Sequence, residues 1–359
     1  MNRDDIARDD DFTGRYARYK RGKMLFGLFL AAALLAVAVY SICAGSVYVS
    51  VGQILRALSG HGDRMNEIIL WNIRLPRVFA AIIAGMSLAL AGCVMQCLLR
   101  NPLASPFTMG ISQAAGFGAA FALIVLAPGN VHIAGIPGAV LNNPYTVTLF
   151  AFAGSVIGII VILSLAKFAG LSPQAMILSG VAMGTLFNAA TMLLQYFAED
   201  IKVASVIFWT FGDMGRVAKA DVMVMLLVAV PAFFYFMRNR RAYNILAGGE
   251  DTAKSLGVRT GRLRFAGMLA ASIITSVCVA FLGIIGFVGL VAPHMVRAVI
   301  GNDNRYLIPI SAVFGALLLL GADTLSRTIM PPAVLPVGIL TSFMGVPLFI
   351  CLILKKRRP

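Results

Sequence analysis

Apolar runs of membrane length constrain the fold of this chain more than any other feature of its sequence. The first run, residues 24–44, contains no charged residue. As a helix it would rise about 31 Å, enough to cross the roughly 30 Å hydrocarbon core of a bilayer. Charged residues make up 13% of the chain and hydrophobic residues 59%, whereas soluble domains carry about 25% charge. The sequence therefore predicts an all-α integral membrane protein embedded in a lipid bilayer.

Ten apolar segments predict about ten transmembrane helices. The eighth segment is short for a span, and the glycine-rich GIIGFVG before it favours a broken helix, which lipid tolerates only where protein or water surrounds it. For the first segment a cleavable signal peptide is the alternative, but its length and the 23-residue charged tail before it favour an uncleaved span. The segments lie near residues 24–44, 77–99, 106–127, 146–168, 173–197, 220–237, 262–284, 286–300, 306–328 and 334–354.

Basic residues predict the orientation of the chain. An even number of spans puts the N-terminal tail, the loop near residues 238–264 and the C-terminal KKRRP on one side. With Arg100, Lys167, Arg297 and Arg305, that side holds 22 of the 30 basic residues. The positive-inside rule makes that side cytoplasmic, so both termini are expected in the cytoplasm. The net charge of +15 then reports topology rather than nucleic-acid binding, because the sequence has no basic stripe with interleaved aromatic residues.

The predicted organisation has three parts. Residues 1–23 form a cytoplasmic tail whose acidic residues lie among arginines without an apolar face, which is typical of a disordered segment. Residues 24–354 form the membrane domain and include a cytoplasmic loop over residues 238–261. Residues 355–359 form a basic cytoplasmic tail.

The sequence gives little support to a metal or redox site. All five cysteines lie in apolar spans, and Cys93 and Cys97 share a helix face without a third ligand nearby. Packing is therefore favoured over a soft metal site. The sequence also lacks an HExxH motif, a CxxC motif and paired carboxylates. We expect no metal or cofactor in this chain.

Asp323 is the buried charge that these spans single out. An ionisable residue inside a membrane is a functional hypothesis by default. Arg327 follows four residues later, the spacing of a pair on one helix face, and a structural ion pair near the outer membrane face is the favoured interpretation. A chain so poor in buried carboxylates is expected to draw its energy from elsewhere, which disfavours an ion-coupled secondary transporter working alone.

The fifth span carries uncharged polar residues at helical spacing. Thr185, Asn188 and Thr191 fall at i, i+3 and i+6 and could share one polar face. Such a face could line a pathway or bond another helix, and the sequence leaves both alternatives open.

The segment GGEDTAKS, residues 248–255, differs from a phosphate-binding loop at one position. Ala253 replaces the glycine that lets phosphate approach the backbone, and Glu250 and Asp251 would repel phosphate. The segment also follows a membrane span instead of a β-strand. We therefore expect no nucleotide site here, but a polar cytoplasmic surface on which a soluble partner docks.

Six segments of the chain together carry a resemblance to a known family: IRLPRVFAAIIAGMSLALAG, RNPLASPFTMGIS, LSGVAMG, LAGGEDTAKSLGV, GIIGFVGLVAPHMVR and LPVGILTSFMGVPLFI. They resemble the permeases of bacterial ABC importers for iron–siderophore, haem and cobalamin complexes, the FecCD-type family. The similarity covers roughly residues 45–354 in the family's order and spacing. It implies a cobalamin-importer-type (type II) ABC permease fold, a homodimer and a place in the cell inner membrane.

The resemblance also implies soluble partners. Two copies of a cytoplasmic ATPase, which hold ATP and Mg²⁺, would dock at the loop that contains GGEDTAKS. An extracytoplasmic binding protein would dock at the other face. This chain would then be a transport subunit and not an enzyme. The positions implied for coupling to the ATPase are Leu246, Gly249, Glu250, Ala253, Leu256 and Gly257.

Two further sets of residues are implied by position. Arg74, Arg77 and Arg327 are expected to be exposed at the outer face, where they would grip carboxylates of the binding protein. The cytoplasmic gate would include residues of RNPLAS and GLSPQ, and at the second of these the chain departs from the small hydroxyl residues of some members. The gate residues are Asn101, Leu103, Ser172, Pro173 and Gln174, with Thr185 and Asn188 along the pathway.

The resemblance favours a metal chelate as the substrate. A ferric siderophore or another iron complex is favoured on family frequency alone, and cobalamin, haem and molybdate-type oxyanions are the alternatives within the family. An ion-coupled secondary transporter and a structural or signalling membrane protein are the hypotheses of other classes.

Overall fold

The structure is a computed structural model that describes residues 3–45, 50–59, 62–126, 145–331 and 333–355. Within these ranges every regular element is helical. Seven of the described helices are long and apolar enough to cross a membrane, and three shorter apolar helices accompany them. Each of the ten predicted spans coincides with one of these helices, so the prediction of an all-α membrane fold is confirmed.

The helices have the following bounds. They are α1 Arg3–Cys43, α2 Val51–Leu58, α3 Arg64–Ile68, α4 Leu75–Leu98, α5 Ile111–Phe121, α6 Tyr145–Phe168, α7 Pro173–Tyr196, α8 Asp200–Thr210, α9 Lys219–Ala247, α10 Glu250–Ser255, α11 Thr260–Leu282, α12 Val288–Ile300, α13 Asn304–Thr328 and α14 Val337–Lys355. Two π-helical turns, Ile69–Arg74 and Ala122–Leu126, join α3 to α4 and extend α5. A short 3-10 turn, Met214–Arg216, precedes α9.

Helix α4 forms the centre of the bundle and is buried along most of its length. It packs against α9, α11, α12 and α13. Glycines allow these close contacts, because a methyl group at Gly92 would overlap the carbonyl of Gly289 and one at Gly85 would overlap that of Gly315. Small residues bring membrane helices together in this way, since lipid supplies no hydrophobic drive between them.

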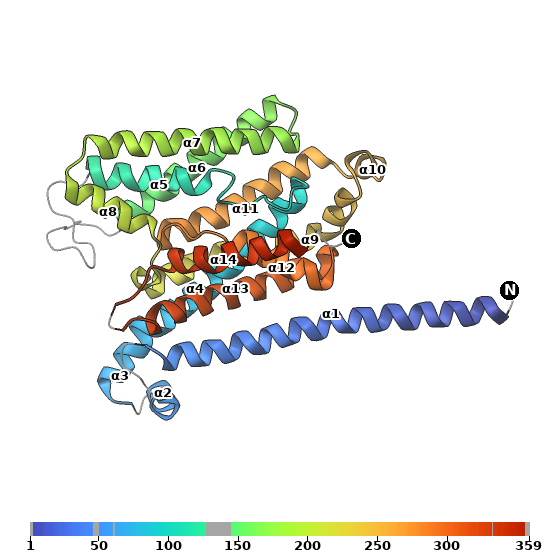
Figure 1. Ribbon diagram of the computed structural model, residues 1–359, viewed down its shortest axis with the longest axis horizontal. Coiled ribbons are helices and arrows are strands. Elements are labelled where there is room, and N and C mark those ends of the chain that lie inside the picture. Colours follow the sequence, from blue (N-terminus) through green and yellow to red (C-terminus); the bar gives the residue numbers. More distant parts are fainter. Residues whose placement is uncertain (1–2, 46–49, 60–61, 127–144, 332, 356–359) are drawn as a thin grey trace.

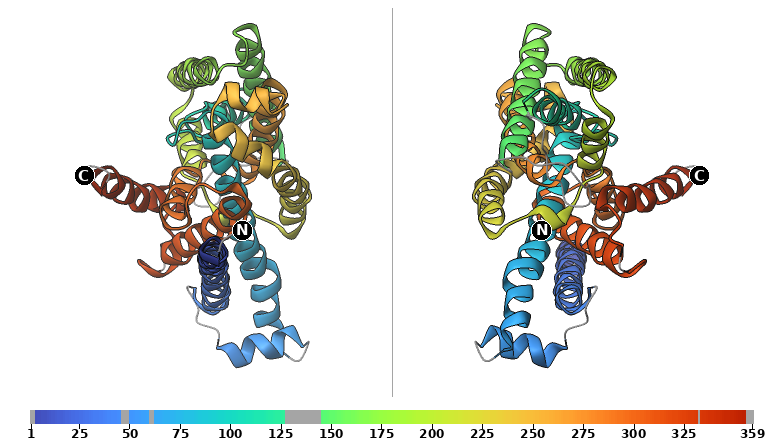
Figure 2. Two further views of the ribbon diagram at one scale, coloured as in Figure 1. Left: turned by 90° about the vertical axis from the view of Figure 1, so that its right-hand side faces the viewer. Right: turned by 90° about the vertical axis from the view of Figure 1, so that its left-hand side faces the viewer.

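The two ends of the bundle carry different elements. The Arg3 end of α1, the Lys355 end of α14 and the short helix α10 lie at one end, whereas α2, α3 and α8 lie at the other (Figure 1). This placement agrees with an even number of crossings that puts both termini and the polar loop on the same side. The end-on views also show that α14 projects sideways from the rest of the bundle (Figure 2).

Three elements differ from the sequence prediction. Helix α1 begins at Arg3, so the tail expected to be disordered is helical here, and residues 3–23 contain no proline that would end a helix. Helix α9 runs to Ala247, beyond the predicted span end at residue 237, so most of the predicted loop is also helical. Helix α8 was not predicted, because its 11 residues are too few for a span.

Candidate functional site

Two irregular segments meet the start of α14 at one side of the bundle. Helix α11 ends at Leu282 and α12 begins at Val288, which confirms the predicted break at GIIGFVG. The Asp213 amide donates to the Leu282 carbonyl at 2.8 Å, and the Gly338 amide donates to the Phe211 carbonyl at 3.1 Å. We call residues 211–213, 283–287 and 337–338 the backbone joint. Its mutual hydrogen bonds satisfy polar groups that lipid could not.

The backbone joint contains two unusual conformations. Gly283 has φ 79°, and a side chain there would overlap the Trp209 carbonyl, so glycine is required. Phe287 has φ 65°, a left-handed conformation that costs a non-glycine residue about 1–3 kcal/mol. Gly345 of α14 lies directly on the Phe287 ring, since a methyl carbon added to this glycine would stand 2.6 Å from the ring. The packing of α14 therefore helps to hold Phe287 in place.

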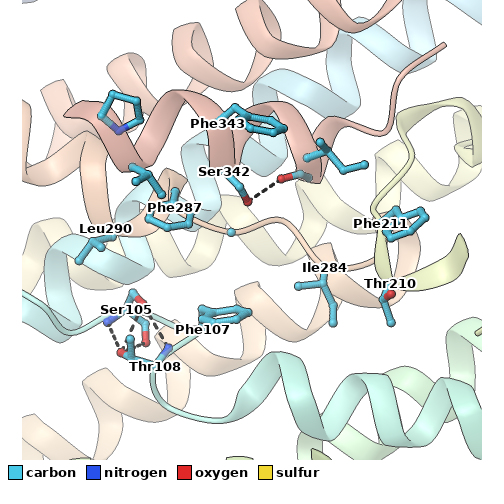
Figure 3. Close-up of a pocket in the computed structure, with 15 residues that line it drawn as sticks. Ser105, Phe107, Thr108, Thr210, Phe211, Ile284, Phe287, Leu290, Ser342 and Phe343 are labelled. Atoms are coloured by element: carbon cyan, nitrogen blue, oxygen red, sulfur yellow. Dashed lines mark hydrogen bonds between the residues drawn. The ribbon is translucent and has the colours of Figure 1, made fainter. Parts of the chain in front are cut away.

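A pocket of about 770 Å³ lies between the backbone joint, α14 and the loop after α4 (Figure 3). Four phenylalanine rings and several aliphatic side chains form most of its wall, and no ionisable residue is among those that line it. Its size is within the range of small-molecule sites. The four phenylalanines are Phe107, Phe211, Phe287 and Phe343.

The hydroxyl groups on the pocket wall are engaged locally. Thr108 Oγ1 donates to the Ser105 carbonyl at 3.0 Å, and it accepts a hydrogen bond from the Ser105 amide at 2.9 Å. Ser342 Oγ donates to the Gly338 carbonyl at 2.8 Å (Figure 3). These groups leave a largely apolar wall, which suits contact with a bulky solute better than coordination of a bare ion.

The predicted gate residues shape two turns. Asn101 Oδ1 accepts a hydrogen bond from the Leu103 amide at 2.9 Å, and Leu103 itself is exposed. Ser172 caps α7 by accepting from the Ala175 amide at 3.2 Å, and Pro173 occupies the first helical position. Gln174 is exposed beside them. These contacts explain the turns, and a gating role for the five residues stays a prediction.

The predicted polar face of α7 points out of the chain. Thr185 and Asn188 are exposed, and Thr191 is half-buried. The hydroxyls of Thr185 and Thr191 donate to carbonyls one turn earlier in α7, at 2.9 and 2.8 Å. The structure therefore gives these hydroxyls partners within α7 and not on another helix of this chain.

The segment GGEDTAKS forms the six-residue helix α10 after the long helix α9. Gly249 has φ 132° and Gly257 has φ 79°, so glycines open and close this short turn. Leu246 and Ala253 are fully buried, whereas Leu256 is 63% exposed. Leu246 and Ala253 therefore pack into the core and anchor α10, and a coupling role for the six positions stays a prediction.

Glu250 connects α10 to the start of α11. Its carboxylate accepts from Arg264 Nη2 at 2.8 Å, and Lys254 Nζ lies at 3.2 Å. The hydrogen bond from Arg264 is the main cause that lowers the pKa of Glu250 to about 2, and Lys254 contributes in the same direction. The Arg264 side chain is 2% exposed, so this charge is buried and paired.

Asp323 lies at the opposite end of the bundle, where three arginines gather. Its carboxylate is fully buried, 2.9 Å from Arg77 Nη2 and 3.2 Å from Arg327 Nε. The predicted pair of Asp323 and Arg327 is confirmed, and Arg77 joins it. Arg327 also donates to Ser41 Oγ at 2.7 Å and to the Ala44 carbonyl at 2.9 Å. We call these charged residues, with Arg74, the outer cluster.

The expectation that Arg74, Arg77 and Arg327 are exposed is wrong for this structure. Arg74 and Arg327 are buried, and 12% of the Arg77 side chain is exposed. Arg74 donates to the carbonyls of Ile42 and Cys43. The physical reason is that the last carbonyls of α1 lack partners within their helix, and the guanidinium groups supply them. Contact with a binding protein stays a prediction.

Comparison with known proteins identifies the family of this chain. A model of the FecCD transport family matches residues 33–355. A Methanocaldococcus jannaschii protein, named as an ABC transporter permease, is 56% identical over 345 residues, which cover 96% of this chain and 98% of that protein. The Fe(3+)-citrate import system permease protein YfmE of Bacillus subtilis is 36% identical and covers 95% of this chain and 98% of its own length.

Other relatives carry other names. The hemin transport system permease protein HmuU of Yersinia pestis is 37% identical over 82% of this chain and 85% of its own length. A solved inward-facing structure of a metal-chelate type ABC transporter matches with a TM-score of 0.79 and 28% identity, over 92% of this chain and 98% of that one. These matches extend over nearly all of the bundle, the pocket and the polar loop. The chain belongs to the FecCD transport family, whose members are permease subunits of ABC importers.

Proposed function

We propose that this chain is the membrane-spanning subunit of an importer that moves a ferric siderophore or another iron complex into the cytoplasm by alternating access. The relative named for Fe(3+)-citrate import, which aligns along almost the whole chain, supports an iron complex. Haem and cobalamin are the competing cargoes, since relatives named for hemin and vitamin B12 are similarly identical.

The pocket is the observation that carries the substrate class. Its wall is aromatic and aliphatic, and it has no ionisable side chain among its lining residues. A bare cation or a free oxyanion such as molybdate would lose its hydration there without a charged partner. A chelate surrounds its metal with an organic shell, so it would contact such an apolar wall without needing a charged partner there. This supports a chelate as cargo.

Exposed apolar surface supports a homodimer. Phe343 of α14 is 74% exposed, and α14 projects from the bundle in both end-on views (Figure 2). Helix α7 also exposes several large apolar side chains, including Leu178, Leu193 and Tyr196. Within one chain these faces are uncovered, and a second copy that packs against them would enclose the pocket between two subunits. Thr185 and Asn188 would then lie toward the shared pathway.

Two soluble partners complete the proposed assembly. A cytoplasmic ATPase, present in two copies with ATP and Mg²⁺, would dock at α10, where Leu256 is exposed and Glu250 is partly exposed. A binding protein would dock at the opposite end, near α2 and α3, with the outer cluster beneath it. Both termini would then face the cytoplasm from the cell inner membrane. ATP hydrolysis would belong to the partner and not to this chain.

Reconstitution tests this proposal. The chain is purified gently from its native membranes, the accompanying ATPase and binding protein are identified, and all three are assembled in proteoliposomes. We expect ATP-dependent uptake of an iron chelate at a rate that unlabelled haem, cobalamin and molybdate do not reduce. Uptake without ATP, from vesicles that contain the chain alone, would overturn the importer proposal. ATP-dependent uptake of haem or cobalamin in place of the iron chelate would overturn the choice of cargo.

A further inference from the structure

Arg264 touches three separate parts of the cytoplasmic end. Its Nη2 donates to Glu250 of α10 at 2.8 Å, and its Nε donates to the Leu98 carbonyl at 3.2 Å. Its Nη1 donates to the Leu171 carbonyl at 3.4 Å. Each of the three guanidinium nitrogens therefore bonds a different segment of the chain. Arg264 stands in the first turns of α11, a helix that crosses the whole bundle.

Two of these bonds hold the turns that contain the predicted gate. Leu98 ends α4 just before Asn101 and Leu103, and Leu171 immediately precedes Ser172. Each turn also contains a non-glycine residue with positive φ, Arg100 at 49° and Leu171 at 56°. Such conformations cost about 1–3 kcal/mol and persist only where the surroundings impose them. Arg264 bonds Leu171 itself and the carbonyl two residues before Arg100.

The third bond holds α10, which has few other polar ties to the bundle. Helix α10 is six residues long, and its Lys254 and Ser255 side chains bond only within the helix among the contacts described. Thr260 Oγ1, at 3.5 Å, is a weaker contact of Glu250. Within the described residues, the ion pair of Glu250 and Arg264, at 2.8 Å, is thus the shortest polar link between α10 and the other helices.

We infer that Arg264 is a positioning residue that transmits movement of α10 to both gate turns. The inference rests on the proposed function, in which an ATPase moves α10. A guanidinium is planar, and its donors are fixed relative to one another. A displacement of Glu250 therefore reorients the donors that hold Leu98 and Leu171. Burial keeps water from replacing these bonds, so both turns respond together.

A lysine at position 264 separates this role from simple anchoring. Arg264→Lys keeps the positive charge and can keep the pair with Glu250, but one ammonium on a flexible stem cannot hold three segments in fixed geometry. The matched control is Arg262→Gln, because Arg262 lies two residues away on the same helix and is exposed. Both variants are assembled with the ATPase and the binding protein.

We expect Arg264→Lys to lower substrate uptake per ATP hydrolysed about tenfold, within the range of coupling energies measured along such networks. Basal ATPase activity and the assembled complex should be preserved, and Arg262→Gln should behave as wild type. Labelling of a cysteine introduced at Leu103 should change with ATP in the wild type and stay constant in Arg264→Lys. Normal uptake per ATP in an intact Arg264→Lys complex would overturn the inference.

A second measurement is independent of transport. In the full chain, Glu250→Gln should speed amide hydrogen exchange in α10 and also in residues 99–103 and 171–175. In the Arg264→Lys background, Glu250→Gln should speed exchange in α10 alone. If Glu250→Gln speeds exchange in α10 and in both turns, but the wild-type complex shows no ATP-driven uptake, the role of Arg264 stands and the proposed function is rejected. Exchange confined to α10 in both backgrounds would reject the role of Arg264, whatever the transport result.

Discussion

The two ends of this protein use the same pair of groups, an arginine and a carboxylate, to different effect. In the outer cluster one fully buried carboxylate, Asp323, accepts from Arg77 and forms an ion pair with Arg327, and other guanidinium donors bond carbonyls at the end of α1. At the opposite end, beside α10, one buried guanidinium, Arg264, divides its donors between Glu250 and two carbonyls.

The difference lies in what each cluster connects. The outer cluster joins α1, α4 and α13, and α4 packs against α13 more extensively than any other pair of helices in the described structure. Fixed charges there reinforce an interface that side-chain packing already holds. At the opposite end, Arg264 joins the six-residue helix α10 to two strained turns. The ion pairs of the outer cluster therefore stabilise a helix interface, whereas the ion pair of Glu250 and Arg264 is placed to transmit movement of α10.

Removing the central carboxylate should have the largest effect on stability. Asp323→Asn leaves two buried guanidinium groups without a negative partner, and we expect the free energy of unfolding to fall by about 3–5 kcal/mol. Unfolding in mixed detergent micelles would measure it. Asp251→Asn, a change at an exposed carboxylate of α10, is the control and should be neutral. Equal stability of Asp323→Asn and wild type would remove the bracing role from the outer cluster.

Arginine-to-lysine exchange should separate the two ends. Arg327→Lys loses the fork that reaches Asp323, Ser41 and Ala44 together, and we expect a loss of about 2 kcal/mol in the free energy of unfolding. Uptake per ATP in reconstituted vesicles should change little. Arg264→Lys should show the reverse pattern. The comparison fails if the two exchanges alter stability and uptake in the same proportion.

Acid should loosen α10 in a defined range of pH. The pKa of Glu250 is lowered from 4.5 to about 2 by Arg264 and Lys254. Because the folded-state pKa is below the unfolded one, the stabilisation is complete above about pH 4.5 and is lost as the pH falls toward 2. Glu250 is 31% exposed, so water screens the pair and the contribution is of order 1 kcal/mol.

Hydrogen exchange of the α10 amides, corrected for intrinsic rates, would follow this change. Protection should fall as the pH drops from about 4.5 toward 2 in the wild type and stay flat in Glu250→Gln. A wild-type profile that is also flat would mean that Glu250 does not hold α10 as an ion.

The smallest effect is expected at the surface pair within α10. Lys254 is 59% exposed and lies 3.2 Å from Glu250 Oε1. Exposed pairs at this spacing contribute about 0.5 kcal/mol or less. Lys254→Ala should therefore leave thermal unfolding and uptake per ATP unchanged. A loss as large as that of Arg264→Lys would shift the link between α10 and the bundle from Arg264 to Lys254.

Most of the fold could be predicted from the sequence, because membrane spans are encoded locally. Each predicted span needs only a run of apolar residues, and the broken helix at GIIGFVG is visible as closely spaced glycines. Helix α8 was not predicted because it is short and because its first three residues include the charged Asp200 and Lys202. The N-terminal extension of α1 was not predicted as helix because its charged composition resembles that of disordered tails.

The site was less predictable, because burial of a charge depends on residues far away in sequence. The spacing of Asp323 and Arg327 indicated their pair, but nothing local shows that the carbonyls of Ile42, Cys43 and Ala44 cover the arginines. Arg264 was missed as a site residue because it was grouped with the basic loop. Its position inside the predicted span 262–284 was the signal that could have identified it.

The backbone joint has a consequence for diversification of the pocket. Its hydrogen bonds run between main-chain groups of residues 211–213, 282 and 337–338, so they do not depend on the identity of the side chains that face the cavity. Mutations at Phe211, Ile284 or Ile339 would reshape the wall while the frame behind it kept its bonds. Gly212, Gly283 and Gly338 are locked in place, because a methyl group on any of them would overlap a backbone carbonyl. The side chains of the pocket wall can therefore change to suit a new cargo, while the main chain of the backbone joint keeps its conformation.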